Sequence, residues 1–162
     1  MNISKLAILM VFVASNTIAG EAIVIDVPGA PLAIQNYEAT YQEDSRYSRE
    51  GIRHSVSITN NGDQDVLAYG IGFFAFDAFN ENMGRPLNGI DMDTISVGSS
   101  SPGAWIQSPP SSFTFRNYGT GVSYVRIARM ADGSVWEADM DYVLSELQKI
   151  ESDLLLEDII NE

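Results

Sequence analysis

The chain has no cysteine, and it holds one histidine and two lysines among its 162 residues. The lack of cysteine excludes disulfides, thiolate metal sites and thiol nucleophiles. A single histidine, His54, without cysteine also leaves too few ligands for a zinc or copper site. We therefore expect no metal cofactor of these kinds, and the fold must be held by its hydrophobic core.

No hydrophobic run is long enough to span a bilayer, and residues 6–14 near the start of the chain form an unbroken apolar run. Lys5 precedes this run, and the small residues Ala19 and Gly20 follow it at the spacing of a cleavage site. The run is too short to span a bilayer, which takes about 20 apolar residues. Residues 1–20 are thus predicted to be a signal peptide that is removed.

Export and the lack of disulfides together favour a bacterial protein that is periplasmic or secreted. Cleavage after Gly20 leaves 162 − 20 = 142 residues, which suits one domain. We expect no membrane span in this mature chain.

Basic residues are scarce, with 9 Lys and Arg against 22 Asp and Glu. Removal of Lys5 makes the mature charge 8 − 22 = −14. Such a surface repels nucleic acid and anionic membranes, and it attracts a basic patch on another protein. A protein of the envelope or medium is the partner that this charge favours, and the charge leaves the oligomeric state open.

Two segments have clear strand patterns. Residues 51–59 alternate, with Ile52, His54, Val56 and Ile58 on one face. Residues 66–79 are apolar on both faces: Leu67, Tyr69, Ile71 and Phe73 line one face, and Phe74 and Phe76 lie on the other. A strand of this kind is covered twice, so a loop, the C-terminal helix or a partner is expected over Phe74 and Phe76.

Turn signals divide residues 21–138 into short strands, a pattern typical of a β-sandwich. Loops are expected at 80–88 and 98–103, and a turn is expected at 119–121. The predicted strands are 22–27, 33–41, 51–59, 66–79, 94–97, 104–108, 112–117, 122–130 and 134–138.

Residues 139–162 change to helical periodicity, because apolar residues recur at intervals of three and four. Asp139 or Asp141 is expected to cap this acidic amphipathic helix. Three interpretations stay open: the helix covers Phe74 and Phe76, it self-associates as a coiled coil, or it docks into a partner's groove. The candidate contact residues on the helix are Leu147, Ile150 and Leu154.

The segment 73–77, Phe-Phe-Ala-Phe-Asp, resembles the signature strand of the FxLYD-type bacterial immunoglobulin-like domains. Phe73 matches the first aromatic residue, Phe76 stands where Tyr is usual, and Asp77 matches the acid, whereas Ala75 replaces Leu. A closing hairpin from Val125 to Trp136 is similar too. The resemblance covers residues 34–138, and it implies an immunoglobulin-like β-sandwich, here followed by a C-terminal amphipathic α-helix, with no catalytic residues.

Two groups of residues are candidate binding sites. Tyr37, Tyr41 and Tyr47 could stack on sugars or anchor a protein, with ordinary packing as the alternative. The carboxylates of Asp77, Asp91 and Asp93 gather around one predicted loop and suit calcium, with solvated loop acids as the alternative.

No pattern in the chain predicts catalysis. His54 lies on an apolar strand face, and no Gly-x-Ser-x-Gly elbow accompanies it. We expect an exported, non-catalytic binding or interaction module without a cofactor. The alternative is a carbohydrate- or calcium-dependent adhesion domain.

Overall fold

The computed structural model describes residues 18–46, 49–109 and 114–160. Of these residues, 51% lie in strands and 12% in helices, so the expected mainly β class is confirmed. Most of the predicted signal peptide, residues 1–17, lies outside the described residues. Within them, no helix has both the length and the apolar character needed to cross a membrane.

The elements follow one another along the chain with strands first and helices last. They are β1 (Ile18–Ala19), β2 (Glu21–Ile25), β3 (Leu32–Gln42), β4 (Gly51–Asn60), β5 (Val66–Asp77), β6 (Leu87–Asp91), β7 (Ser100–Gln107), the 3-10 helix η1 (Thr114–Asn117), β8 (Tyr118–Met130), β9 (Val135–Glu137), α1 (Met140–Leu147) and α2 (Leu156–Ile159).

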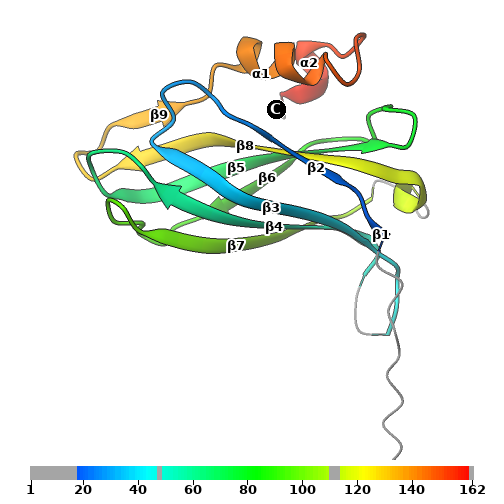
Figure 1. The fold of residues 1–162 in the computed structure, drawn as a ribbon, viewed down its shortest axis with the longest axis horizontal. Helices are drawn as coiled ribbons and strands as arrows, with labels where there is room; N and C mark the ends of the chain where they lie inside the picture. Colours follow the sequence, from blue (N-terminus) through cyan, green and yellow to red (C-terminus); the bar gives the residue numbers. More distant parts are fainter. Residues whose placement is uncertain (1–17, 47–48, 110–113, 161–162) are drawn as a thin grey trace, which may run out of the picture.

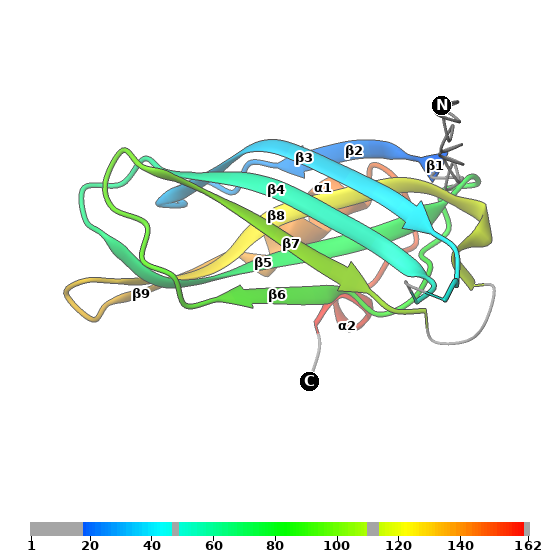
Figure 2. The same cartoon turned by 90° about the horizontal axis from the view of Figure 1, so that it is seen from below.

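In the part of the chain that the structure describes, the strands form two sheets. Sheet A has the order β1-β3-β4-β7 and is antiparallel throughout. Sheet B has the order β2-β8-β5-β6, and β9 pairs with β8 beyond the end of β2. β2 runs parallel to β8, whereas the other pairs are antiparallel. The sheets lie face to face, and α1 and α2 lie beyond sheet B (Figure 1). Figure 2 shows β3, β4 and β7 of sheet A side by side, on the face of the molecule opposite α1 and α2.

The space between the sheets holds the inner layer of the core. Alternate residues of β5 point into it, and Ile71 and Phe73 are fully buried there. The predicted alternation of β4 is confirmed, because Ile52, His54 and Ile58 are also fully buried. Packing both sheets around these side chains removes their apolar surface from water, which is the main stabilising term.

A second apolar layer, the outer layer, lies between sheet B and the C-terminal segment. Phe74, Phe76, Val122 and Tyr124 contribute from the sheet, and the Phe74 and Tyr124 rings stack with centroids 6.0 Å apart. The C-terminal segment contributes Val143, Leu147, Leu154 and Ile159. Of the three interpretations left open, the one in which this segment covers Phe74 and Phe76 is therefore confirmed, and its buried stripe is not free to form a coiled-coil seam.

The prediction of one helix over 139–162 is wrong. Asp139 caps α1 as expected, since its carboxylate accepts from the backbone N–H groups of Asp141 and Tyr142. The helix then ends at Leu147, and the Gln148 side-chain amide donates to the Leu154 carbonyl at 2.9 Å across a turn. After this turn, Leu154 is buried against sheet B as Leu147 is.

Several boundaries also differ from the prediction. Residues 100–107, expected to begin as a linker, form β7, and β6 begins within the expected loop at 80–88. The strand expected at 94–97 is a single bridge between Ile95 and Val66, and part of the strand expected at 112–117 is η1. Bulged register near Val66 also turns Leu67 outward, to 39% exposure.

Gly119 and Gly121 lie within β8 and do not form the expected turn. A Cβ atom on Gly121 would lie 2.5 Å from the Tyr37 hydroxyl and 2.6 Å from the Tyr118 hydroxyl. This glycine therefore serves the close approach of aromatic side chains inside a strand.

Candidate binding groove

The structure does not place the tyrosine candidates on an aromatic surface. Tyr37 and Tyr41 are 9% and 3% exposed and belong to the inner layer, so the prediction that they bind a ligand at the surface is wrong. A bulge between Ile34 and Asn36 shifts the alternation of β3 by one residue, so that Tyr37 and Tyr41 point inward. Tyr47 lies outside the described residues.

Tyr37 instead belongs to a chain of buried hydrogen bonds. The Gln107 side-chain amide donates to the Arg85 carbonyl at 2.9 Å, so its oxygen faces His54. His54 Nε2 therefore donates to Gln107 Oε1 at 3.0 Å, and its Nδ1 accepts from the Tyr37 hydroxyl at 2.8 Å. The Phe73 ring stacks on His54 with centroids 4.5 Å apart.

This environment keeps His54 neutral. Burial lowers its pKa to about 4, against an opposing effect of the hydrogen bond with Gln107. Burial also raises the pKa of Tyr37 above its usual value, with a smaller contribution from Tyr118. No solvent reaches His54, so the histidine has a structural role, as the sequence indicated.

The predicted calcium ligands are not brought together. Asp91 lies opposite Tyr69, while Asp77 is eight residues further along β5, roughly 26 Å away at the ordinary rise of a strand. Asp77 Oδ1 accepts from the backbone N–H groups of Phe79 and Glu81, and Asp91 accepts from Tyr69 and from the Asp93 N–H. The site proposed from Asp77, Asp91 and Asp93 is therefore wrong. Among the described residues, no group of three or more His, Cys, Asp or Glu is placed to hold a metal ion.

The helical candidates divide into buried and exposed positions. Leu147 and Leu154 are 0% and 2% exposed against sheet B, and Ile150 is half-buried beside them. These three residues are therefore core or its border, and none presents a free contact surface. The exposed apolar side chains of the segment are Leu155, Leu156 and Ile160, at 55%, 36% and 46% exposure.

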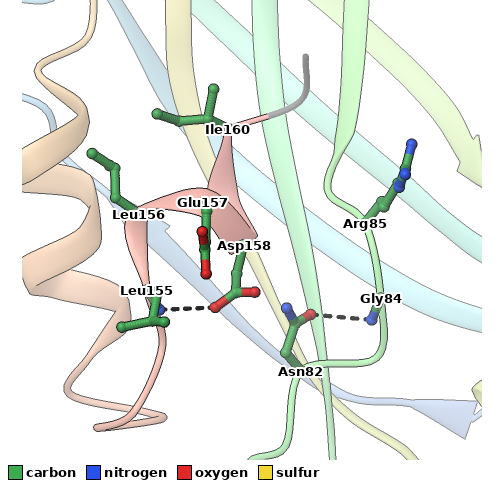
Figure 3. Close-up of a pocket in the computed structure, with 8 residues that line it drawn as sticks. All are labelled: Asn82, Gly84, Arg85, Leu155, Leu156, Glu157, Asp158 and Ile160. Atoms are coloured by element: carbon green, nitrogen blue, oxygen red, sulfur yellow. Dashed lines mark hydrogen bonds between the residues drawn. The ribbon is translucent and has the colours of Figure 1, made fainter.

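These three side chains line a groove of about 1040 Å³ between the C-terminal segment and the loop that joins β5 to β6. Leu155, Leu156, Glu157, Asp158 and Ile160 form one wall. Asn82, Gly84 and Arg85 form the other, and Figure 3 shows the two walls facing each other. No local sequence pattern indicates the groove, because its second wall comes from a loop about 70 residues away in the chain.

Backbone hydrogen bonds fix the loop wall. The Met83 N–H donates to the Ala75 carbonyl at 2.9 Å, and Asn82 Oδ1 accepts from the Gly84 N–H at 3.2 Å. Gln107 holds the Arg85 carbonyl from the core side. The wall is therefore anchored to both sheets and does not depend on a ligand for its shape.

The helical wall is fixed in a similar way. Leu155 and Leu156 lie in the sequence between two buried residues, Leu154 and Ile159. Asp158 Oδ2 also accepts a hydrogen bond from the Leu155 N–H at 2.9 Å. Glu151 accepts from the Asn82 N–H at 3.2 Å and so ties the two walls together. Leu155 and Leu156 are consequently held facing solvent.

Acidic side chains outnumber basic ones at the groove, since Glu157 and Asp158 line it together with Arg85. Burial raises the pKa of the neighbouring Glu151, the hydrogen bond from the Asn82 backbone lowers it, and the carboxylates of Asp158, Glu81 and Asp153 raise it. Arg85 is the one basic side chain among the described residues that line the groove. The arrangement offers apolar contact, negative charge and one cation, with no nucleophile–base pair and no metal-binding cluster among these residues.

Comparison with known proteins adds a likeness of fold. No family model and no curated protein matches the chain. A crystal structure of a hypothetical protein from Peptoclostridium difficile 630 superposes with a TM-score of 0.54 and 13% sequence identity. The match covers 75% of this chain and 91% of that chain. At this identity the likeness shows the fold alone.

Proposed function

We propose that this protein is an exported, non-catalytic binding module of the bacterial envelope or medium, and that the groove beside α2 is its contact site for a protein partner. The observation that carries the proposal is the exposure of Leu155, Leu156 and Ile160 together in one groove with rigid walls. Large apolar side chains gathered in this way are typical of protein contact sites.

An immunoglobulin-like assignment of the sandwich fits this proposal. β3, β4 and β7 correspond in order and pairing to strands A, B and E, and β9, β8, β5 and β6 correspond to G, F, C and C′. The segment 73–77 then lies on strand C, and the hairpin from Val125 to Trp136 is the F–G hairpin.

The signal peptide also agrees with the strand boundaries. β2 begins at Glu21, so a cut after Gly20 keeps all of sheet B and removes only the two residues of β1. Cleavage at this point thus leaves the groove unchanged.

Site-specific photo-crosslinking tests the proposal. A photoreactive residue replaces Leu155 in the groove, and in a matched protein it replaces Met92, which is 80% exposed and lies outside the groove. We expect a discrete protein adduct in an envelope or culture-medium fraction from position 155 only. Equal labelling from both positions, or none from either, would contradict a binding role for the groove.

A further inference from the structure

We propose that the occupant of the groove is a basic peptide segment of the partner, with aliphatic side chains that pack on Leu155, Leu156 and Ile160 and Lys or Arg side chains that face the acidic wall. This inference rests on the proposed function and names the chemistry of the partner.

The apolar part of the argument is the position of the three exposed residues. The contact of this segment with sheet B is made by Leu154 and Ile159, whose side chains are only 2% and 3% exposed. Leu155, Leu156 and Ile160 are therefore not used in the protein's own core and remain exposed along the groove that they line. Burying aliphatic side chains against them gains about 25 cal/mol for each Å² of apolar surface.

Charge decides which peptides fit. Residues 151–160 contain Glu151, Asp153, Glu157 and Asp158 and no basic residue. The nearest lysine, Lys149, is paired with Glu146. An acidic or neutral peptide leaves this charge uncompensated, whereas a basic one is steered toward the wall by electrostatic attraction.

Arg85 sets the orientation of the peptide. Its guanidinium offers only donors, from the wall opposite Glu157 and Asp158. A peptide that turns its cationic side chains toward the acids presents backbone carbonyl oxygens on its other side as acceptors for Arg85. One extended segment thus satisfies both walls.

Other occupants fit less well. A second copy of the chain brings a mature charge of −14 to a site that is already acidic. The chain's own last residues, Asn161 and Glu162, bring no positive charge. Nucleic acid is repelled by the same acids that attract a basic peptide.

Selection from a random-peptide phage library tests the proposal without a known partner. The purified protein is the bait, and the Leu155→Ser variant is used for counter-selection. We expect the enriched peptides to combine Lys or Arg with Leu, Ile or Phe. Enrichment of acidic or neutral peptides, or of peptides that the variant retains equally, would overturn the proposal.

Affinity of one enriched peptide then locates the contact. Leu155→Ser is expected to weaken binding roughly 30-fold, and Glu157→Gln roughly threefold. Salt at about 1 M, where the Debye length falls to ~3 Å, should abolish the effect of Glu157→Gln. Met92→Ser and Asp44→Asn are matched exposed controls and should bind as the unsubstituted protein does. Thermal melting of each variant shows that it is folded.

The two proposals fail in different ways. A crosslinked partner at position 155 together with non-basic selected peptides retains the binding role and overturns the basic occupant. A dimer that Leu155→Ser dissociates makes a second copy the occupant and also overturns it. Absence of both adduct and enriched peptides overturns both proposals.

Discussion

The two faces of sheet B are both covered by apolar layers, but the layers are built differently. The inner layer is closed by another sheet and contains the buried chain Tyr37–His54–Gln107. The outer layer is closed by a short helix and an irregular segment from the end of the chain, and apolar and aromatic side chains form most of it. The inner layer thus joins strands of both sheets, whereas in the outer layer a short C-terminal segment packs on one face of sheet B.

This difference explains why the candidate groove lies where it does. A sheet covers its partner along the whole strand length, whereas α1 and α2 cover only the part of sheet B around Phe74 and Phe76. At the border of this cover, apolar residues that do not reach the sheet remain exposed. The groove is therefore a consequence of an incomplete second layer.

Removal of the outer cover should have the largest effect. A chain that ends after Ala138 loses four buried side chains, Val143, Leu147, Leu154 and Ile159, each worth about 1.5–3 kcal/mol. The sum is comparable with the whole stability of about 5–15 kcal/mol for a typical domain. We expect an aggregated or partly unfolded product by circular dichroism and dye binding. A monomer with an unchanged melting temperature would show that the outer layer contributes little.

A single substitution distinguishes the buried stripe from the rest of α1. Leu147→Ala removes a fully buried side chain and should lower the free energy of unfolding by about 2–5 kcal/mol. Leu144→Ala, on the same helix at a half-buried position, should cost less than half as much. Urea denaturation measures both. Equal losses would mean that the sheet-facing stripe of α1 is not its main support.

The inner layer should respond to acid through His54. Its pKa falls from 6.5 in the unfolded chain to about 4 in the folded protein, so the unfolded state binds more protons between these values. The contribution of neutral His54 to the free energy of unfolding is fully present above pH 6.5 and is lost as the pH falls toward 4. The total loss is ~3 kcal/mol.

The matched control for this pH effect is His54→Gln, which keeps a polar side chain and removes the titration. Its stability should be lower at pH 7 but should change less between pH 6.5 and 4.5, measured by urea denaturation across this range. Parallel curves for the two proteins would assign the acid sensitivity to carboxylates and not to the inner layer.

The cap of α1 should give a smaller effect. Asp139→Ala removes the acceptor for two backbone N–H groups and should cost about 1 kcal/mol. Asp141→Ala, in the first turn without the capping role, should cost about 0.3–1 kcal/mol at low salt. The difference in melting temperature between the two variants measures how much the Asp139 cap contributes to the stability of α1.

The sequence predicted the inner layer better than the outer one, for a physical reason. Alternation along β4 and β5 is local, so Ile52, Ile58 and Phe74 could be placed from neighbouring residues alone. α1 ends at Leu147, whereas the 3.6-residue pattern of apolar residues continues past this point to Leu154 without interruption. A pattern of this kind records which residues are buried, not whether the helix between them is continuous.

The candidate sites were predicted less well, because exposure is a tertiary property. Tyr37 and Tyr41 carry the same phenol whether they are buried or exposed, and only the pairing of β3 turned them inward. Asp77 ends β5, whereas Asp91 ends β6 and lies opposite Tyr69 near the other end of β5, so two acids close in sequence are far apart in space. Leu155, by contrast, has no local signal that separates it from its buried neighbour Leu154.

The smallest expected change in stability is at Leu155, next to one of the most buried positions in the outer layer. Leu155→Ser removes an apolar side chain that is already 55% exposed, so the free energy of unfolding should change by no more than about 0.5 kcal/mol. Leu154→Ser, one residue earlier, should cost several times more because it places a hydroxyl among apolar side chains. Urea denaturation of this pair locates the border between core and groove to one residue. Similar losses at both positions would mean that Leu155 supports the fold, and only Leu156 and Ile160 would then remain as free apolar contacts of the groove.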